Sequence, residues 1–527
     1  MVSRIAWMVT IAVALSCTGG GGETHVTTAG EATDASTDAS TTDGEVTSGT
    51  ESDTSTTAGT GSDPTTSSDS DATDSSDTDG TETDASDTDA SDTDTDASTD
   101  TDTGIEPPAC DVIAIEDSRV EAEVREALDL PDGPIPPELL LTLTKLHVSS
   151  VKDDKASSLV GLECAAELLE LEVRYGQLKD ITPLQWLAKL EDLDLQGNKF
   201  AALPPGLEPL RDLDNLWRLD LASTGLTDLE VLSSLDALAL LLIGENAIDD
   251  LTPLAEVSSL QLVFARDNDI SELSPLAQLP ALTSLSLGKN PIAELSPLAS
   301  VATLEWLDVD EIDATALDPL AGLLALEHVS AERGVISSVH FGAQPQLREL
   351  FLTDNLIADI SGLAGLTGLE VLFLEKNQVQ DLTPLAGMQA LERLRVGDND
   401  IVDLSPLAGA TALTELWIRN NKIKDLAPLA GHPLEIVLAN DNEITSIAPV
   451  ATFVPLWEIN LSNNQISDLK PIADPAWAEL QCLHLDLRGN PLNAEAIDEI
   501  IPSLCAKGVF ISWGDNEDCN VQCLPQP

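Results

Sequence analysis

The side chains that most often do chemistry are spread thinly along this chain. No Gly-x-Ser-x-Gly motif, His-Glu-x-x-His motif or phosphate-binding loop occurs. No nucleophile, base or metal-ligand set converges, so the sequence predicts a protein that is not an enzyme and has no catalytic residue, cofactor or metal centre. The six histidines lie far apart in the sequence: His25, His147, His328, His340, His432 and His484.

The densest group of possible oxygen ligands is WLDVDEID, at residues 306–313. Asp308 and Asp310 share one predicted strand, and Glu311 and Asp313 lie at the turn that follows. These carboxylates could hold calcium or a cationic partner. We prefer a solvated acidic patch, because the whole chain is acidic.

Six cysteines lie toward the two ends of the region from 107 to 527, which in an exported chain predicts disulfides that fasten those ends. Six cysteines allow fifteen pairings, of which we expect Cys110 with Cys164 and bonds among the other four. Cys482 replaces a core leucine, so a buried thiol is its alternative. Without a paired Cys-x-x-Cys or His-x-x-x-His, a zinc site is disfavoured. The six are Cys110, Cys164, Cys482, Cys505, Cys519 and Cys523.

The seventh cysteine, Cys17, follows a predicted targeting segment at 1–16. A single arginine precedes an apolar run at 5–15, and a small residue precedes the cysteine. This pattern resembles a bacterial lipoprotein signal. The resemblance implies cleavage before Cys17, lipidation of its thiol and anchoring in the cell envelope. Thr18 carries no inner-membrane retention mark, so we expect the outer membrane or cell surface. Ala14 stands where a larger aliphatic residue is usual, so plain secretion stays open.

The segment 17–106 is built almost entirely from Asp, Ser, Thr, Gly, Ala and Glu, and it contains no Lys or Arg. Such a composition buries too little apolar area to fold, so we expect a disordered, extended tether. Cation chelation or glycosylation of the run is the alternative. The net charge of the chain is -67, with 92 acidic and 25 basic residues. Nucleic-acid binding is therefore excluded, because no basic surplus exists to displace counterions.

The rest of the chain repeats with a period close to 22 residues, which is typical of a solenoid. An apolar-x-apolar strand precedes one ladder position in each of fifteen turns. Stacked asparagines there can satisfy the backbone where each coil leaves its strand. An acid follows four residues later in ten turns. We expect these acids to cap the next turn or to solubilise the surface rather than to form a metal ladder, because each turn supplies one carboxylate and a calcium cage needs several converging oxygens. A Ser/Thr-Pro pair then predicts an N-capped 3₁₀ or α turn. The ladder positions are Gly176, Asn198, Thr224, Asn246, Asn268, Asn290, Ile312, Gly334, Asn355, Asn377, Asn399, Asn421, Asn442, Asn464 and Asn490.

The two ends of the repeat region read as caps that cover its exposed apolar edges. Helical spacing of apolar residues and N-cap types predict helices at 117–128 and 136–143. At the other end we expect a helix at 493–506 and a strand at 509–513. The predicted organisation is thus a signal peptide at 1–16, a tether at 17–106, an N-terminal cap at 107–166, repeats at 167–492 and a C-terminal cap at 493–527.

This pattern resembles the 22-residue leucine-rich repeats of bacterial internalins and of eukaryotic phosphatase-regulating subunits. The resemblance covers roughly residues 117–513. It implies an α/β horseshoe, with a concave parallel β-sheet and convex short 3₁₀ or α turns. It also implies that the concave sheet binds another macromolecule, usually a protein. The predicted signal and tether favour the surface-exposed bacterial branch.

Residues between the repeated leucines should face outward on the concave sheet, because alternate strand residues point to opposite faces. This column is acidic at its N-terminal end and aromatic from residue 351 to 438. Aromatic residues and arginines enrich protein-binding sites, and this chain has few of either. Packing of these side chains on one another is the alternative. The predicted contact residues are Phe351, Phe373, Arg393, Arg395, Trp417 and Arg419.

The sequence therefore predicts a monomeric, surface-tethered protein–protein recognition module whose only contact with the membrane is its lipid. The second hypothesis is a structural or adhesive spacer of the cell envelope, held by its acidic rows and divalent cations. The two hypotheses differ in their expected sensitivity to calcium.

Overall fold

The structure, a computed structural model, describes residues 110–149, 154–200, 206–473, 483–514 and 517–519. These residues belong to the second of two compact units, Asp100–Pro527, whereas the first, Met1–Thr99, falls outside the described ranges. The predictions made for residues 1–106 therefore lie outside the described residues. Within those ranges, no helix is both long enough and apolar enough to cross a membrane.

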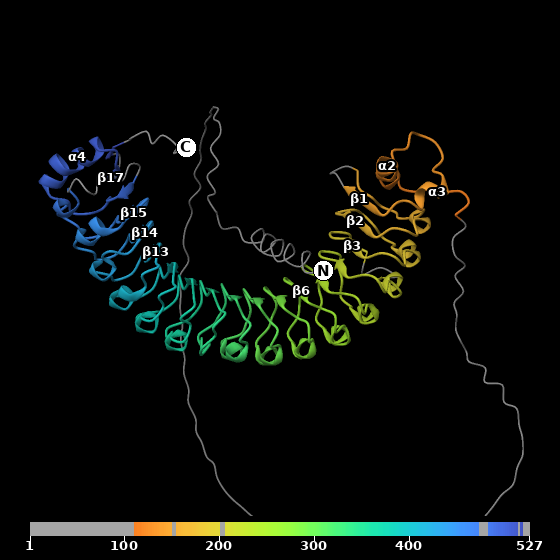
Figure 1. Ribbon diagram of the computed structural model, residues 1–527, viewed down its shortest axis with the longest axis horizontal. Coiled ribbons are helices and arrows are strands. Elements are labelled where there is room, and N and C mark those ends of the chain that lie inside the picture. Colours follow the sequence, from red (N-terminus) through yellow and green to blue (C-terminus); the bar gives the residue numbers. More distant parts are fainter. Residues whose placement is uncertain (1–109, 150–153, 201–205, 474–482, 515–516, 520–527) are drawn as a thin grey trace, which may run out of the picture. The chain divides into compact units, whose positions relative to one another are not determined.

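One sheet organises the unit, and its strands line the inner side of the arc in Figure 1. Strands β1 to β17 each pair in parallel with their neighbour in sequence, and β18 pairs antiparallel with β17. The predicted solenoid with a parallel sheet is confirmed. The strands are β1 (Lys145–Ser149), β2 (Glu170–Arg174), β3 (Asp192–Asp194), β4 (Arg218–Asp220), β5 (Leu240–Leu242), β6 (Leu262–Phe264), β7 (Ser284–Ser286), β8 (Trp306–Asp308), β9 (His328–Ser330), β10 (Glu349–Phe351), β11 (Val371–Phe373), β12 (Arg393–Arg395), β13 (Glu415–Trp417), β14 (Ile436–Leu438), β15 (Glu458–Asn460), β16 (His484–Asp486), β17 (Phe510–Gly514) and β18 (Glu517–Cys519).

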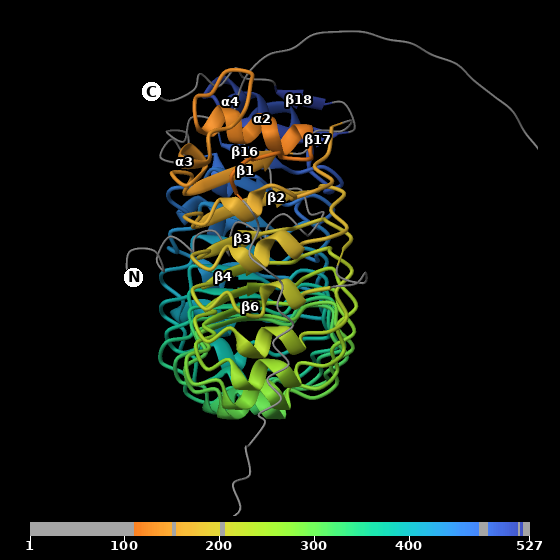
Figure 2. The same ribbon diagram turned by 90° about the vertical axis from the view of Figure 1, so that its right-hand side faces the viewer.

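Short 3₁₀ helices form the outer side of the arc and stack one above another in Figure 2. Each brings a buried apolar residue, such as Leu385 or Leu407, against the core behind the sheet. The helices are η1 (Leu162–Cys164), η2 (Thr182–Trp186), η3 (Glu208–Leu210), η4 (Glu230–Ser234), η5 (Thr252–Glu256), η6 (Ser274–Gln278), η7 (Ser296–Ser300), η8 (Asp318–Gly322), η9 (Ser361–Leu363), η10 (Thr383–Leu385), η11 (Ser405–Gly409), η12 (Ala427–Leu429), η13 (Ala448–Thr452) and η14 (Lys470–Ile472).

The asparagine ladder joins each turn to the turn before it. In the turn of Asn399, the side-chain Oδ1 accepts a hydrogen bond from the Val379 amide at 2.9 Å. Its Nδ2 donates to the Leu374 carbonyl of the preceding turn at 2.8 Å and to the Val396 carbonyl of its own turn at 3.1 Å. The other ten asparagines bond the preceding turn in the same way. Each one thus pairs backbone groups that would otherwise be buried without partners.

The residue before each ladder position has a left-handed backbone. Asp398 has φ 57° and Asn420 has φ 50°, and Gly197 and Gly489 fill the same place in two other turns. This conformation reverses the chain direction after the strand and turns the next side chain inward. It is unfavourable for most non-glycine residues, so the hydrogen bonds of the ladder must offset its cost.

The acids that lie four residues after the ladder positions cap the 3₁₀ helices, which confirms capping as an expected role for them. The Ser or Thr that the Ser/Thr-Pro pairs predicted as the N-cap is instead the first helical residue. In η10 the Asp381 Oδ1 accepts from the Thr383 amide at 2.8 Å, and Thr383 is itself the first helical residue. The hydroxyl and amide of residue 383 hold the pKa of Asp381 below its ordinary value. Seven other aspartates accept the same hydrogen bond from the backbone amide two residues later: Asp180, Asp228, Asp250, Asp359, Asp403, Asp425 and Asp468.

Helices cover both ends of the repeat region, as the sequence predicted. At the first end α2 (Ser118–Ala127) is N-capped by Asp117 and buries Val120 and Val124. Helix α3 (Pro137–Leu140) follows and leads into β1. At the other end a π-helical turn, η16 (Ala496–Ile500), continues into α4 (Ile501–Ala506).

Each cap contains one disulfide. Cys110 is bonded to Cys164, the pair expected at the first end, and Cys505 is bonded to Cys519 at the other. The second bond connects α4 with β18. Cys482 and Cys523, like Cys17, lie outside the described residues, so their pairing remains a prediction.

We predict that Asn399→Ala destabilises the repeat region by about 1–3 kcal/mol. The substitution leaves the Val379 amide buried without a partner, which costs about that much, whereas the Leu374 and Val396 carbonyls each keep a bond from a neighbouring ladder asparagine. Urea unfolding followed by circular dichroism measures the change. Gln378→Ala, at an exposed side chain of the neighbouring turn, should change the unfolding free energy by less than about 0.5 kcal/mol. Equal effects of the two substitutions would contradict the role of the ladder.

Candidate partner-binding face

Four of the six predicted contact residues occupy the same position in four neighbouring strands. The strand register pairs Phe351 with Phe373, Phe373 with Arg395, and Arg395 with Trp417. The leucines between them and their strand partners point into the core and are fully buried, as Leu372 and Leu394 are. The four side chains therefore stand on the concave face, where each is partly exposed.

These side chains contact one another directly. The rings of Phe351 and Phe373 meet edge to face with centroids 4.9 Å apart. The Arg395 guanidinium carbon lies 4.2 Å from the Phe373 ring centroid and 3.5 Å from that of Trp417. Arg395 is thus held between two aromatic rings, and each cation–π contact contributes about 0.5–1 kcal/mol at such a site. The indole Nε1 of Trp417 is buried and has no acceptor among the described residues.

The three arginines of the predicted site are paired with carboxylates of neighbouring strands. Arg395 contacts Glu415 at 2.7 Å. Arg419 contacts Glu375 at 3.2 Å and also approaches Asp398. Arg393 lies 3.8 Å from Glu349 and is the most exposed of the three. The expected positive anchors are therefore neutralised within the chain, which the sequence column alone did not reveal.

The aromatic contacts continue beyond the predicted residues. Phe351 packs against His328 with centroids 5.1 Å apart, and His328 stacks on Trp306 at 5.3 Å with 15° between the ring planes. Phe264 follows at 6.2 Å. It reaches across β7, where Ser284 and Ser286 are small and buried. We call this set the aromatic row: Phe264, Trp306, His328, Phe351, Phe373 and Trp417.

Sequence reasoning missed Phe264, Trp306 and His328, half of this row, because it looked for aromatic contact residues only from residue 351 onward. Trp306 and His328 are the first residues of β8 and β9, whereas Phe351 and Phe373 are the last residues of β10 and β11. The row therefore moves to the neighbouring column at β8 and β9 and returns to the first column at β10. The signal was present, since the column two residues earlier in the repeat also faces outward.

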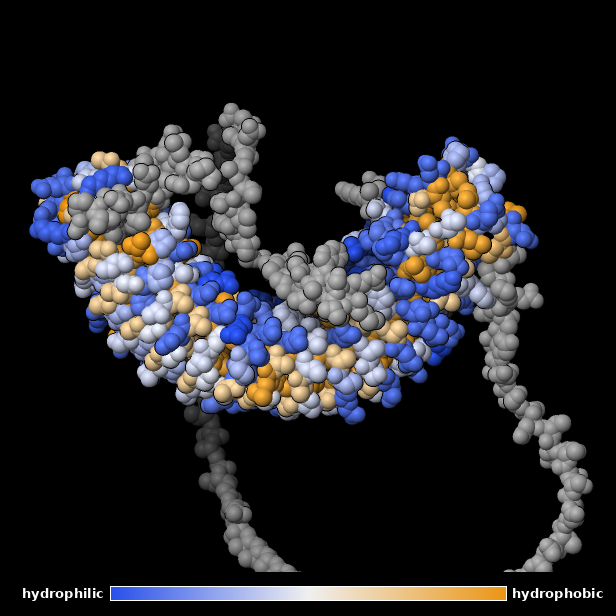
Figure 3. Space-filling view, viewed as in Figure 1, coloured by the Kyte–Doolittle hydropathy of each residue, from blue (hydrophilic) through white to orange (hydrophobic). Residues whose placement is uncertain are grey.

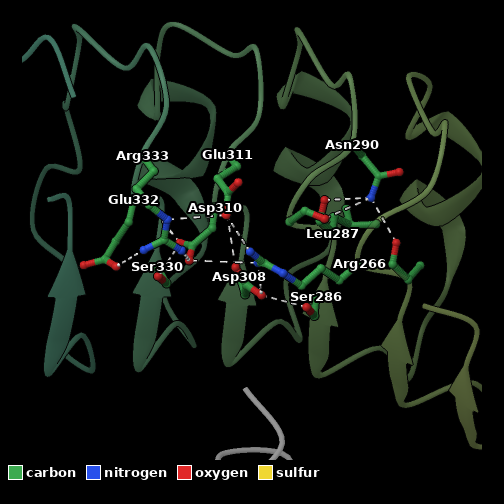
Figure 4. Close-up of polar contacts among 12 residues, drawn as sticks. Arg266, Ser286, Leu287, Asn290, Asp308, Asp310, Glu311, Ser330, Glu332 and Arg333 are labelled. Carbon is green, nitrogen blue, oxygen red and sulfur yellow. Dashed lines mark hydrogen bonds and ion pairs between the residues drawn. The ribbon is translucent and has the colours of Figure 1, made fainter. Parts of the chain in front are cut away.

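The carboxylates of residues 308–313 are mostly satisfied by other side chains, as Figure 4 shows. Asp308 accepts from the Ser286 hydroxyl at 2.7 Å, and Arg333 donates to Asp310 at 2.9 Å. Arg266 donates to Glu311 at 2.9 Å. Burial and the neighbouring Asp310 raise the pKa of Asp308. No metal-binding group of three or more His, Cys, Asp or Glu side chains is found among the described residues.

A second network of charges lies at the N-terminal end of the sheet. Asp194 and Asp220 are paired in register and almost fully buried. Arg174 contacts Asp194 at 2.7 Å, and Arg218 lies 3.2 Å from Asp194 and 3.5 Å from Asp220. Burial, with the charge of Asp194, raises the pKa of Asp220 to about 7.

Five histidines fall in the described ranges, and they occupy separate sites. His147 pairs with Glu170, and His340 pairs with Asp318. His432 is buried and bonded to two backbone carbonyls, and His484 packs on Phe510. His328 lies in the aromatic row beside Glu349. The described part of the chain thus brings no two histidines together.

The parallel strands, the asparagine ladder and the convex 3₁₀ turns together define a leucine-rich repeat solenoid, a fold that is generally not catalytic. The family model for leucine-rich repeats in two copies matches residues 258–300, 345–387 and 389–431. Among curated proteins, none matches the sequence.

Solved leucine-rich repeat structures are similar to this chain at low sequence identity. An internalin, InlF, from Listeria monocytogenes is 24% identical with a TM-score of 0.51, over 70% of this chain and 95% of that one. The functional domain of InlJ from the same organism is 21% identical with a TM-score of 0.52, over 71% of this chain and 79% of that one. Toll of Drosophila, in its complex with Spatzle, is 18% identical with a TM-score of 0.55, over 68% of this chain and 52% of that one. The protein therefore shares its fold with bacterial internalins.

We predict that Asp220→Asn stabilises the protein at pH 8 by roughly 1–3 kcal/mol and has little effect at pH 4. The folded-state pKa of Asp220, about 7, lies above its ordinary value of 3.8. The folded chain therefore binds this proton more tightly, and wild-type stability falls as the pH rises from about 4 to about 7. Thermal unfolding at both pH values tests this.

The matched control is Asp236→Asn, since Asp236 is exposed just after η4. It should leave the pH dependence unchanged. A loss of stability for Asp220→Asn at pH 8 would show that the contact with Arg218 outweighs the cost of burying the carboxylate.

Proposed function

We propose that this protein is a surface-anchored recognition module that binds a protein partner on its concave face. The observation that carries the proposal is the aromatic row together with Arg395, which lies partly exposed across β6 to β13. Tryptophan, tyrosine and arginine dominate the binding energy of protein interfaces, and phenylalanine is also enriched there.

Preorganisation of the face supports this proposal. Arg395 is fixed by two rings and by Glu415, and Phe373 is fixed between Phe351 and Arg395. Side chains that are already ordered lose little conformational entropy when a partner binds, so more of the contact energy becomes affinity. In contrast to the aromatic row, the side of the repeat region that faces the viewer in Figure 3 carries a mixture of hydrophobic and hydrophilic residues.

Structural relatives also support a protein ligand. The Toll structure is a complex with Spatzle. The ectodomain of the plant receptor kinase GASSHO1/SCHENGEN3 was solved with CASPARIAN STRIP INTEGRITY FACTOR 2, and it is 19% identical to this chain with a TM-score of 0.50. We transfer from these complexes only the class of ligand, a polypeptide.

We further propose that the module is exported and held at the cell envelope by a lipid on Cys17, with 17–106 as its tether. The support is the targeting pattern at 1–16 and the two disulfides of the caps, because disulfides persist in oxidising compartments.

We predict that a photo-crosslinking residue placed at position 393 captures a protein partner on intact cells. Arg393 is exposed on the concave face beside the aromatic row. Adding Phe373→Ser or Trp417→Ser should lower the yield of the adduct at least about tenfold, as expected for the loss of a hot-spot residue. Mass spectrometry of the adduct measures the yield.

The matched control replaces Leu356, which is 50% exposed outside the sheet. The crosslinker at position 356 should not capture the same partner, and Leu356→Ser should leave the adduct at position 393 unchanged. An adduct that is insensitive to both Phe373→Ser and Trp417→Ser would reject this face.

We predict that Cys17→Ser moves the protein from the membrane fraction to the soluble fraction. The thiol is the only proposed attachment point for lipid, and removing it removes the apolar anchor. Detergent partitioning and metabolic labelling with a fatty-acid analogue measure the change. Unaltered membrane association and labelling in the variant would contradict the lipid anchor.

A further inference from the structure

We propose that the concave face takes a cationic polypeptide segment, in which lysine or arginine residues are interspersed with apolar ones. This inference rests on the proposed function and names the chemistry of its partner. The argument depends on which charges of the face are already used within the chain and which are not.

An edge row of acidic residues runs beside the aromatic row. The residue just before each of β8 to β14 hydrogen-bonds through its backbone to the residue in the same place of the next turn, as the Glu327 amide does to the Glu305 carbonyl at 2.8 Å. Five of the seven side chains are glutamates and one is an arginine. The edge row is Glu305, Glu327, Arg348, Glu370, Glu392, Thr414 and Glu435.

Four glutamates of the edge row make no ion pair within the described part of the chain. Arg348 forms its ion pair with Glu370, at 3.7 Å. Glu305, Glu327 and Glu392 are exposed, and Glu435 is half-buried. The arginines of the face, in contrast, are all matched to carboxylates: Arg266, Arg333, Arg393, Arg395 and Arg419. A partner therefore meets unmatched negative charge next to apolar rings.

The dimensions suit an extended segment that runs across the strands. Parallel strands lie about 4.8 Å apart, so the seven strands from β8 to β14 span roughly 29 Å, the length of about nine extended residues. Successive side chains of such a segment point in opposite directions. Alternate basic residues can then reach the edge row while the apolar ones contact the aromatic row.

The geometry of the rings disfavours a carbohydrate on the same face. Sugars bind by stacking on an open aromatic face, but Trp306 stacks on His328 and the face of Trp417 is covered by Arg395. An anionic partner is opposed by the edge row. Charge and ring geometry thus both favour a basic polypeptide.

The test titrates the full-length protein with three synthetic peptides of about nine residues, followed by calorimetry at about 50 mM and about 500 mM NaCl. The first alternates lysine with leucine, the second has glutamate for lysine, and the third has serine for leucine. We expect only the first to bind well, and we expect its Kd to rise at least about tenfold at the higher salt concentration.

Two paired variants locate the binding. Glu327→Gln with Glu392→Gln should raise the Kd of the lysine–leucine peptide about tenfold, and Phe373→Ser should do the same. The matched control is Glu230→Gln with Glu256→Gln, which removes the same charge from exposed positions in η4 and η5. This control should leave the Kd within about twofold.

Three outcomes would overturn the inference. If the glutamate peptide binds with sensitivity to Phe373→Ser, the face binds a polypeptide of the opposite charge and the proposed function stands without its cationic partner. If the control pair weakens binding as much as the edge-row pair, the interaction is general charge attraction. If no peptide binds, the cationic class is rejected, and the crosslinking from position 393 decides the proposed function separately.

Discussion

The rest of the structure depends on one hydrogen-bonded side chain per turn. Each ladder asparagine donates to carbonyls of its own and the preceding turn and accepts from an amide of the preceding turn, as Asn399 does with Val396, Leu374 and Val379. Without it, the left-handed turn that follows each strand would leave a buried amide of the preceding turn, such as that of Val379, unpaired. Because the bonds connect neighbouring turns, they also fix the strand register. That register decides which side chains meet on the concave face.

On that face, the repeat fixes where each outward side chain lies, and the residues that differ from turn to turn determine the rings and charges that the face presents. Register places Phe373 beside Phe351 and Arg395 because all three end their strands. Charges follow the same logic: Glu415 can hold Arg395 only because the two face the same side of adjacent strands. The ion pairs within the chain then decide the sign of the unpaired charge that the face presents to a partner. A concave face with several arginines can still present mainly negative charge, because each of these arginines is already paired with a carboxylate.

The periodicity of the sequence was enough to predict the fifteen turns, the parallel sheet, the ladder and the outward position of Phe351, Phe373, Arg395 and Trp417. It could not show contacts that cross columns, such as Trp306 on His328, because these depend on side-chain rotamers and on the small residues of β7. For the caps of the 3₁₀ helices it offered both the acids and the Ser or Thr residues of the Ser/Thr-Pro pairs. The aspartates cap, because Thr383 is itself the first helical residue and its free amide donates to Asp381. The repeat pattern of the sequence thus identifies which residues face outward on the sheet. The contacts among those side chains, which decide what a partner would meet, can be read only from the structure.

The ladder has a further consequence for how the protein ages. Asparagine deamidates when the backbone nitrogen of the next residue attacks its side-chain carbonyl to form a cyclic imide. In the turn of Asn399 that nitrogen, on Asp400, is held by the Val379 carbonyl at 3.0 Å, and the side-chain amide is held by both turns. Neither reacting group can rotate toward the other without opening the stack. The following amide is held in the same way at eight of the eleven ladder asparagines, and proline follows Asn290 and Asn490. The fold thereby protects these residues, which it can least spare, against slow chemical decay.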